Sequence, residues 1–569
     1  MKAAAAFVLY VGLAVVLSWP LAAHLGTHLP NTWWTAQFDA LYTGWALAWE
    51  AHALATAPAR IVEGNIFHPT RHALLYGTTA AGALPFFAPV FWLGGNPTLA
   101  LNVTFLAGIV LTAWTVHVVV RRWTGSHAAG LIAAWTLLMS RWLFWGPPST
   151  SLDYTVLHYF PFIVLLAARP AERFTDTLPI VALVVLQSLV NLFYVAPAVF
   201  VPLGLLAAVR LVRRPTRAAG ARLLAAAALA ALVLVPMYAG HLAVRAENPD
   251  LSRQTFWRTA SPPVTRPSNL LRDDMPTAVP IPALVLILVG GAVRALRGRR
   301  PAATPPAAWT HAVFWTACGV LLSLKPVPPS RAAALLGAWV PQLAALRVPG
   351  RLGVPALIGV ALLAGLACAE CVRRFPPLAR AAFVAVAAAA LYANGPWTPL
   401  RPRGPRLLAY PLAATITPGG PIVQALESPG GPLLELPIGR DGREEPGPQA
   451  RAMYRSIFHW RPLLNGYSSY WPAAHVGRMG LARRLPDPDA LRALHAETGL
   501  QAVLVHGREL TDVERRAWSA AATEAGSPLR LLVRDGDDLL FEVADSRGGT
   551  RPAARRYRQA SRGACRRSV

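Results

Sequence analysis

Long apolar stretches recur through the first 394 residues, and they limit the possible folds more than any other feature. Most are close to the roughly 20 residues that a helix needs to cross the hydrocarbon core of a membrane. Only 14% of the 569 residues are charged, against about 25% in a typical soluble protein. We therefore expect an all-α membrane bundle in residues 1–394. Its eleven predicted spans are 3–22, 97–120, 127–145, 155–168, 177–192, 194–212, 221–241, 279–296, 305–324, 353–372 and 378–394.

Arginine clusters follow every second stretch and predict the orientation of the chain. They include Arg121-Arg122, Arg213-Arg214 and Arg373-Arg374. By the positive-inside rule these loops are cytoplasmic, as is the N-terminus, and the intervening loops are extracytoplasmic. A signal peptide is the alternative for the first stretch. The net charge of +26 is spread over such short loops, so we expect no nucleic-acid partner.

The first extracytoplasmic loop, residues 23–80, is polar and rich in tryptophan and histidine. Helical spacing from Asp39 onward places Trp45 and His52 on one side, and Asp39 and Glu50 on another. We expect a helix on the membrane surface, with its tryptophan side among the headgroups and its acidic side facing a cleft. Capping of this helix is an alternative role for Asp39.

Proline and glycine interrupt the chain after residue 394, and no further long apolar stretch occurs. We predict a small extracytoplasmic α/β domain in residues 395–545, followed by a disordered basic tail in 546–569. The expected elements are strands at Pro432–Pro437 and Gln501–His506, a helix at Asp487–Glu497, and a hairpin of Leu529–Val533 and Leu539–Val543.

Four segments carry a resemblance to a known superfamily: residues 39–52, Gly64–Pro69, Leu346–Arg351 and Phe458–Tyr467. With the large first loop, its acidic residue, its interfacial helices and the C-terminal domain, the chain resembles the GT-C superfamily of integral membrane glycosyltransferases. It resembles most narrowly a bacterial group of GT-C-like proteins. The resemblance implies an enzyme of the bacterial plasma membrane. Such an enzyme transfers a sugar from a polyprenyl-phosphate donor to a glycan, lipid or protein acceptor outside.

The resemblance also implies roles for individual residues. The first-loop acid of GT-C enzymes is the base that takes the acceptor's proton, and this role carries over to Asp39. Asp153 in the second outer loop is the matching candidate for a helper or metal-binding acid, with helix capping as its alternative. A departing lipid phosphate needs a cation. Arg347 and Arg351 are candidates, since guanidinium binds phosphate through two hydrogen bonds, and interfacial anchoring is their alternative.

Acceptor binding is a further expectation, because sugars stack on aromatic rings. The candidates are Glu50, His52, Trp460 and Tyr467, and close packing between domain and membrane is the alternative. No cofactor or metal ligand is assigned, although a divalent metal is conceivable. His68 and His72 have a spacing that serves a metal on a helix, but Pro69 disfavours a helix there.

Two other functions remain open at the level of sequence. One is a non-catalytic membrane protein of cell-envelope assembly or lipid handling, built on the same scaffold and contacting membrane lipid. The other is a transporter, which is disfavoured because the spans carry few charges. Gln187 and Asn191, four residues apart in the fifth span, are expected to hydrogen-bond to neighbouring segments. Cys368 and Cys371 are expected to be buried small apolar residues.

Overall fold

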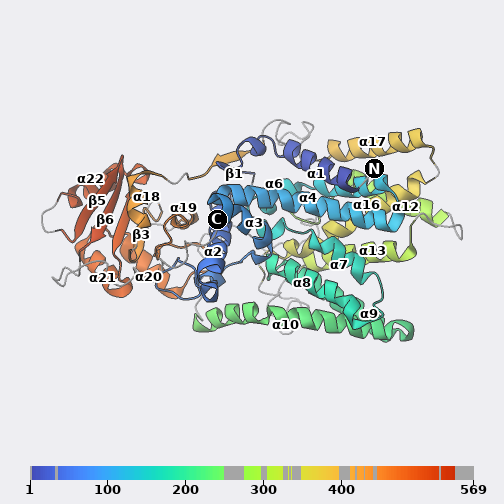
Figure 1. Ribbon diagram of the computed structural model, residues 1–569, viewed down its shortest axis with the longest axis horizontal. Helices are drawn as coiled ribbons and strands as arrows, with labels where there is room; N and C mark the ends of the chain where they lie inside the picture. Colours follow the sequence, from blue (N-terminus) through green and yellow to red (C-terminus); the bar gives the residue numbers. More distant parts are fainter. Residues whose placement is uncertain are drawn as a thin grey trace, which may run out of the picture.

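The computed structural model is elongated, with a helical bundle at one end and a small sheet covered by helices at the other (Figure 1). Helix α2 (Leu41–Thr56) lies between the two, across the end of the bundle (Figure 1). The residues that the structure describes are 3–32, 36–248, 275–296, 304–324, 331, 335, 346, 348–373, 375–395, 410–416, 419–428, 430–439, 445–523 and 527–544.

A helix occurs at each of the eleven predicted spans. In chain order these are α1 (Ala3–Leu17), α4 (Pro97–Thr124), α5 (His127–Leu138), α7 (Tyr159–Ala167), α8 (Leu178–Val190), α9 (Val195–Val212), α10 (Arg217–Glu247), α12 (Ile281–Leu296), α13 (Pro306–Ser323), α16 (Val354–Val372) and α17 (Pro377–Ala393). Within the described residues, four segments are long and apolar enough to cross a membrane: Pro97–Thr124, Val195–Val212, Arg214–Glu247 and Pro349–Val372. The mostly helical, apolar architecture agrees with the prediction. Eleven crossings and their orientation stay predictions.

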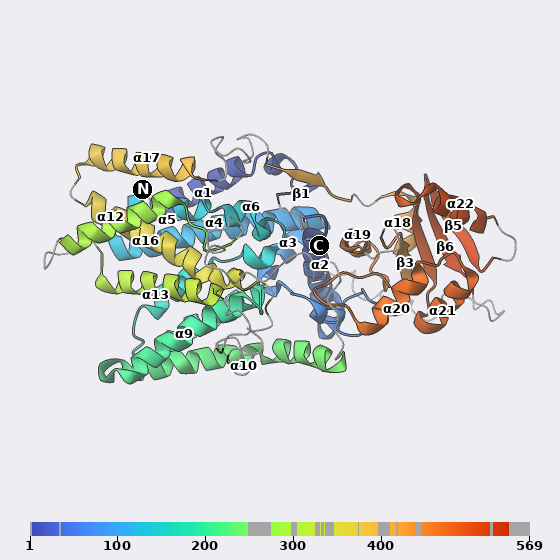
Figure 2. The ribbon, with the colours of Figure 1, turned by 180° about the vertical axis from the view of Figure 1, so that it is seen from behind.

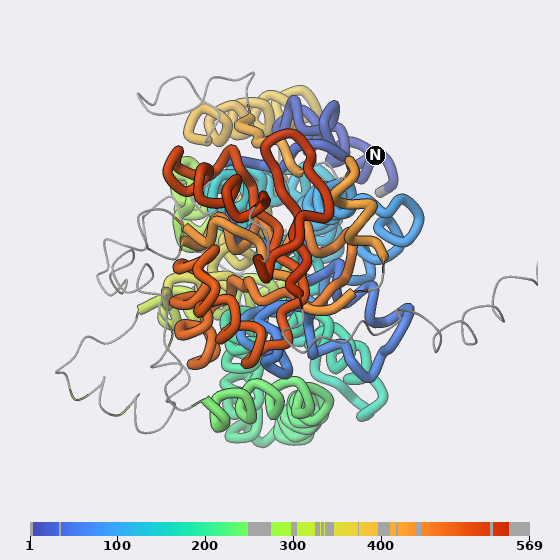
Figure 3. The backbone as a smooth tube through the Cα atoms, turned by 90° about the vertical axis from the view of Figure 1, so that its left-hand side faces the viewer, coloured from blue at the N-terminus to red at the C-terminus, as the bar shows by residue number. Residues whose placement is uncertain are grey.

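Helix α16 forms the centre of the bundle and is almost wholly buried. It packs against α5, α12 and α13, whereas α10 and α17 lie at opposite edges of the bundle (Figure 3). Small residues allow the close approach. A Cβ at Gly359 would lie 2.3 Å from Thr316 Oγ1, and one at Gly319 would lie 2.2 Å from Ala356 N. This packing fixes the short helix η11 (Pro349–Gly353) that leads into α16.

The first loop contains a series of short elements around α2. They are β1 (His28–Pro30), the π-helical turn η2 (Ala36–Ala40), η3 (Pro58–Arg60), η4 (Ala73–Tyr76), η5 (Ala81–Ala83) and α3 (Leu84–Gly94), with α6 (Arg141–Trp145), η6 (Pro147–Ser149) and η7 (Leu152–Tyr154) in the second loop. Helix α2 packs against α3 on the bundle side and against α19 (Pro446–Ser456) of the C-terminal part.

The expected exposure of α2 at the membrane surface is wrong for its tryptophan side. Trp45 is fully buried, and its indole N–H donates to Asn65 Oδ1 over 2.8 Å. Trp49 is 8% exposed and donates to the carbonyl of Ile61 over 3.0 Å. The loop after α2 supplies both acceptors, and the Trp49 ring also contacts Trp460, with centroids 5.9 Å apart. Protein therefore takes the place that was predicted for lipid headgroups.

The C-terminal part, residues 410–544, contains a four-stranded sheet with the order β3-β4-β6-β5. Strands β3 (Leu433–Leu436) and β4 (Ala502–His506) are parallel, whereas β6 (Asp538–Val543) is antiparallel to both β4 and β5 (Leu529–Asp535). The predicted strands and hairpin are confirmed, and so is the predicted helix, as α21 (Pro488–Thr498). Helices α18 (Gly420–Glu427), α20 (Ala473–Ala482) and α22 (Asp512–Ala521) were not predicted.

The two faces of this sheet belong to different hydrophobic cores. Leu434, Val503 and Phe541 pack with α20, α21 and α22 in a core of their own. Leu433 and Leu504 on the other face join the core that continues through α19 into the bundle. The sheet thus lies over the end of the bundle when the molecule is viewed along its long axis (Figure 3).

A second, two-stranded sheet ties the first loop to the chain beyond α17. Strand β1 pairs in antiparallel register with β2 (Leu412–Ala414), and Leu29 lies opposite Ala413. The pairing is visible where the strand from the C-terminal part passes the first loop (Figure 2). Short pairings of this kind between distant segments are not visible in a local sequence pattern.

Candidate active site

Asp39 lies in the π-helical turn η2, immediately before α2. Its Oδ1 accepts a hydrogen bond of 2.7 Å from the hydroxyl of Tyr467. Its backbone carbonyl accepts one of 2.9 Å from Thr43 Oγ1. The N-cap residue of α2 is Ala40, and no side-chain capping bond is present there. The cap interpretation of Asp39 is therefore wrong, because the preceding turn already satisfies the start of the helix.

Asp153 is buried in the loop segment that precedes α7. Ser151 Oγ donates to its Oδ1, and Asn191 Nδ2 donates to its Oδ2 over 2.7 Å. Helix α7 begins at Tyr159 without a side-chain cap. The alternative interpretation of Asp153, a cap for this helix, is wrong, because the carboxylate is bonded to Asn191 at the end of α8.

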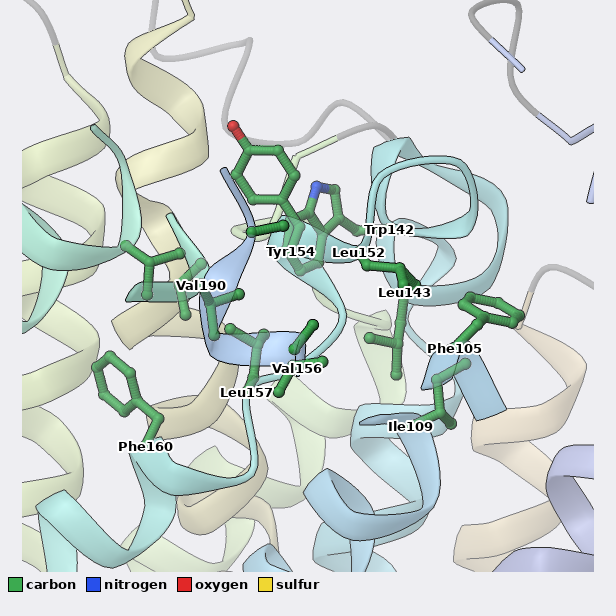
Figure 4. Close-up of a cluster of buried hydrophobic side chains, with 14 of the residues drawn as sticks. Phe105, Ile109, Trp142, Leu143, Leu152, Tyr154, Val156, Leu157, Phe160 and Val190 are labelled. Carbon is green, nitrogen blue, oxygen red and sulfur yellow. The ribbon is translucent and has the colours of Figure 1, made fainter. Parts of the chain in front are cut away.

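Residues 152–157 are fixed by a buried cluster on one side (Figure 4). Val156 and Leu157 are fully buried in this cluster, and Gln187 Nε2 donates to the carbonyl of Val156 over 2.8 Å. The expected hydrogen bonding of Gln187 and Asn191 is thus confirmed. The phenol oxygen of Tyr154 points away from the cluster (Figure 4), so the segment presents Tyr154 to a different neighbour.

That neighbour is Arg351, which lies in η11 at the start of the central helix. Its guanidinium carbon lies 5.1 Å from the ring centre of Tyr154 and 5.9 Å from that of Tyr194. Its Nη1 donates to the Tyr154 hydroxyl over 3.3 Å. Two aromatic faces thus hold the guanidinium by cation–π attraction. Arg347, the other predicted phosphate-binding residue, lies outside the described residues.

The charges of Asp39, Asp153 and Arg351 act on one another. Burial raises the pKa of Asp153 to about 6, and the nearby charge of Asp39 adds to this effect. The hydrogen bond from Ser151, the positive charge of Arg351 and the hydrogen bond from Asn191 oppose it. Three segments that are far apart in sequence therefore bring two carboxylates and one guanidinium into a single electrostatic neighbourhood.

The predicted acceptor-binding residues do not form one surface beside Asp39. Tyr467 contacts Asp39 directly, whereas the His52 ring stacks on Trp460 with centroids 4.2 Å apart. A helix rises about 1.5 Å per residue, which puts His52 roughly 20 Å along α2 from Asp39. The aromatic residues of the segment around Trp460 and Tyr467 are thus divided between the two ends of α2.

Glu50 is buried on the same helix, with 1% of its surface exposed. Among the residues that the structure describes, its Oε2 has no hydrogen-bond partner. Burial raises the pKa of its carboxyl well above the ordinary value. Burial also raises the pKa of Tyr42, and the charges of Glu50, Asp153 and Asp39 add to that rise. Glu50 is therefore a buried carboxyl group whose burial disfavours its charged form, rather than an exposed acceptor ligand.

His68 and His72, the pair whose spacing suggested a metal site, do not share a helix face. His68 Nε2 donates to the carbonyl of Thr498 over 3.2 Å, and the His72 backbone N–H donates to Glu63 Oε2 over 3.2 Å. Across the described residues, the structure contains no group of three or more His, Cys, Asp or Glu side chains that could hold a metal ion.

Some residues of the site were not found by sequence reasoning. Tyr154 follows Asp153 directly, so its position beside a candidate acid was an available signal. Tyr194 had no local signal, because its role depends on η11: its hydroxyl accepts from the Val348 backbone N–H over 3.3 Å. Asn191 was expected to hydrogen-bond to a neighbouring segment, but nothing in the sequence linked it to Asp153.

No protein-family model and no curated protein matches the sequence. Among solved structures, the arabinofuranosyltransferase AftD from Mycobacteria aligns with 95% of this chain and 41% of its own, with a TM-score of 0.53 and 15% identity. The chain has a GT-C-like fold. Apo ArnT from Cupriavidus metallidurans aligns with 94% of this chain and 97% of its own (TM-score 0.46, 13% identity). The undecaprenyl-phosphate-bound form of ArnT aligns with 96% of this chain and 99% of its own (TM-score 0.47, 14% identity).

Within this fold, the candidate site draws its charged residues from three short elements. The turn η2 carries Asp39, η7 carries Asp153 and η11 carries Arg351. Thr32 of the first loop and Ser149 of the second loop are joined by a side-chain hydrogen bond. The first and second outer loops are therefore joined directly by two of their side chains.

Proposed function

We propose that this protein is an inverting membrane glycosyltransferase. It transfers a sugar from a polyprenyl-phosphate carrier to a glycan, lipid or protein acceptor at the extracytoplasmic face of the bacterial plasma membrane. The observation that carries the proposal is geometric. The Arg351 guanidinium lies against the ring of Tyr154, which is next in sequence to the buried Asp153. The loop of Asp153 is hydrogen-bonded to the loop of Asp39 through Ser149 and Thr32. The fold likeness to AftD, an arabinofuranosyltransferase, supports the same reaction class.

The proposed reaction is a single displacement at the anomeric carbon. The acceptor oxygen forms a bond to this carbon while the bond to the carrier phosphate oxygen breaks, and the lipid phosphate leaves with the electron pair. The acceptor proton passes to Asp39, the general base. The caged guanidinium of Arg351 neutralises charge that develops on the departing phosphate. Attack opposite to the leaving group inverts the anomeric centre.

Asp153 serves this reaction as a second acidic group. With a pKa of about 6, its carboxyl group is mainly ionised at neutral pH and mainly protonated when the pH is below this pKa. In its ionised form Asp153 places a negative charge near Arg351. We assign Asp153 the role of orienting the Arg351 guanidinium. The stacked rings of His52 and Trp460, at the other end of α2, are proposed to contact a more distant part of a long acceptor.

Transfer of labelled sugar by the purified protein tests the proposal. Wild type and Asp39→Asn are compared on a panel of polyprenyl-phosphate sugars, and thermal unfolding verifies that both are folded. The substitution keeps the shape of the side chain and removes its basicity, so a loss of transfer of roughly a hundredfold or more is expected. Equal transfer by both proteins contradicts the role of Asp39. No transfer by wild type from any donor, with lipid still bound, favours the non-catalytic scaffold.

A further inference from the structure

The hydroxyl of Tyr467 is directed at the proposed base, although Tyr467 lies in the C-terminal part. We propose that Tyr467 is a positioning residue for Asp39, and that the segment 459–471 is an integral wall of the active site. This inference rests on the proposed function, and it replaces the earlier expectation that Tyr467 binds the acceptor. The carrying observation is the 2.7 Å hydrogen bond from the phenol to Asp39 Oδ1.

The Tyr467 ring is buried against the elements that bear Asp39. Only 4% of its surface is exposed. Its centroid lies 5.5 Å from that of Phe38 and 5.9 Å from that of Tyr42, both in edge-on geometry. A phenylalanine would satisfy this packing equally well. The hydroxyl therefore has a purpose beyond packing: it fixes the orientation of the Asp39 carboxylate.

Backbone hydrogen bonds hold the segment 459–471 against the first loop. Leu463 N–H donates to the carbonyl of Asn65 over 2.6 Å, and His68 N–H donates to the carbonyl of Leu463 over 2.9 Å. Phe67 N–H donates to the carbonyl of Asn465 over 3.1 Å. A Cβ at Gly466 would lie 2.3 Å from the Phe67 ring. Main-chain pairing at this density places Tyr467 far more rigidly than side-chain packing alone does.

The same segment is anchored to the sheet of the C-terminal part. The Asn465 side chain accepts from Glu435 N–H over 2.7 Å and donates to the Glu435 carbonyl over 2.9 Å. The Tyr467 N–H donates to Met453 Sδ of α19 over 2.9 Å. A continuous set of contacts therefore runs from strand β3 through Asn465 and Tyr467 to Asp39. The sheet holds the segment that orients the base.

Tyr467→Phe in the full-length protein tests this role. We expect the kcat for sugar transfer to fall roughly tenfold to a hundredfold, because a hydrogen bond to a charged group is lost. The KM for the donor is expected to stay within about twofold, since the phosphate contact with Arg351 is untouched. If Tyr467→Phe only reduced the amount of folded protein, its effect on the transfer rate would add to that of Asp39→Asn. We expect the double variant to be no slower than Asp39→Asn alone.

Tyr454→Phe is the matched control. Tyr454 is also a buried tyrosine of the C-terminal part, and its hydroxyl is hydrogen-bonded to Thr98 Oγ1 on α4 over 2.5 Å rather than to Asp39. The kcat of Tyr454→Phe is expected to equal that of wild type. If Tyr467→Phe also matches wild type while Asp39→Asn is inactive, the positioning role is overturned and the proposed function stands. If wild type transfers no sugar from any donor, both are overturned.

Discussion

Asn191 Nδ2 donates a hydrogen bond of 2.7 Å to Asp153 Oδ2, and both side chains are buried. The amide oxygen of Asn191 accepts in turn from the backbone N–H groups of Phe193 and Tyr194, each over 2.9 Å. The chain that leaves α8 thus fixes the amide, and the amide fixes the carboxylate. The same turn supplies Tyr194 to the cage of Arg351, so one bend in the chain supports both charged groups.

Asn191→Ala is expected to move the acid limb of the pH–rate profile upward. The Asn191 hydrogen bond lowers the pKa of Asp153, which burial has raised to about 6. Removing the bond raises this pKa further, so Asp153 stays protonated to higher pH. The shift should be roughly one pH unit, given the strength of a hydrogen bond to a charged group. The measurement is kcat between pH 5 and pH 9.

Gln187→Ala is the control for this experiment. Gln187 is a buried amide on the same helix and donates to the carbonyl of Val156, not to a carboxylate. Its substitution is expected to lower stability without moving the acid limb. Identical pH profiles for Asn191→Ala and Gln187→Ala would remove Asp153 from the reaction.

Arg351→Lys is expected to lower kcat/KM for the lipid-linked donor roughly tenfold to a hundredfold. Lysine keeps the charge, but it loses the two-pronged contact with phosphate and the stacking on Tyr154 and Tyr194. The measurement is initial rate against donor concentration. Arg530→Lys is the matched control, because Arg530 is an exposed residue of β5 that pairs with Glu542 and such pairs contribute little. A normal kcat/KM for Arg351→Lys would exclude the phosphate role.

A buried charge network in the C-terminal part predicts how stability depends on pH. His506 Nε2 lies 3.1 Å from Glu435 Oε2, and its Nδ1 lies 2.9 Å from Asp538 Oδ2. Arg455 Nε donates to Glu435 Oε2 over 2.6 Å. Burial and Arg455 act to lower the pKa of His506, but the hydrogen bonds with Asp538 and Glu435 outweigh them and raise it overall. His459 is also near enough for its charge to act on Glu435.

The sign of the effect follows from the directions of these shifts. The contribution of His506 is fully present below its ordinary pKa of 6.5 and is lost as pH rises through the raised value. Burial opposes ionisation of Glu435 and Asp538. The charge of Arg455 outweighs burial at Glu435, and the hydrogen bond with His506 outweighs burial at Asp538. Both pKa values are therefore lowered. Their contributions are therefore lost as pH falls below the ordinary 4.5 and 3.8. The network stabilises most between these limits.

We expect the Tm of wild type to fall between pH 6 and pH 8 relative to that of His506→Gln. Glutamine keeps hydrogen-bonding atoms but has no titrating charge, so the pH dependence from this site should disappear. The difference in unfolding free energy between the two proteins should shrink as pH rises over that range, because the protonated form of His506 is the stabilising one. Parallel Tm curves for the two proteins would show that His506 is not charged in the folded state.

The sequence by itself determined the helices at the predicted spans and the strands of the C-terminal sheet. Apolar content is a local property, and each predicted span contains a helix for that reason. The short apolar run at Ala502–His506 and the turn residues between β5 and β6 are likewise local signals. The resemblance to GT-C enzymes, together with the chemistry of the residue types, nominated Asp39, Asp153 and Arg351.

Only the tertiary structure decided how these elements meet. Tyr467 and Asp39 are separated by 428 positions, and no local pattern can indicate a hydrogen bond at that distance. The buried indole of Trp45 is hydrogen-bonded to the loop residue Asn65, and hydropathy cannot distinguish burial in protein from burial in lipid. The cage of Arg351 depends on a turn after α8 that contacts η11. Side-chain chemistry is encoded residue by residue, whereas the geometry that makes a site depends on packing between segments far apart in the chain.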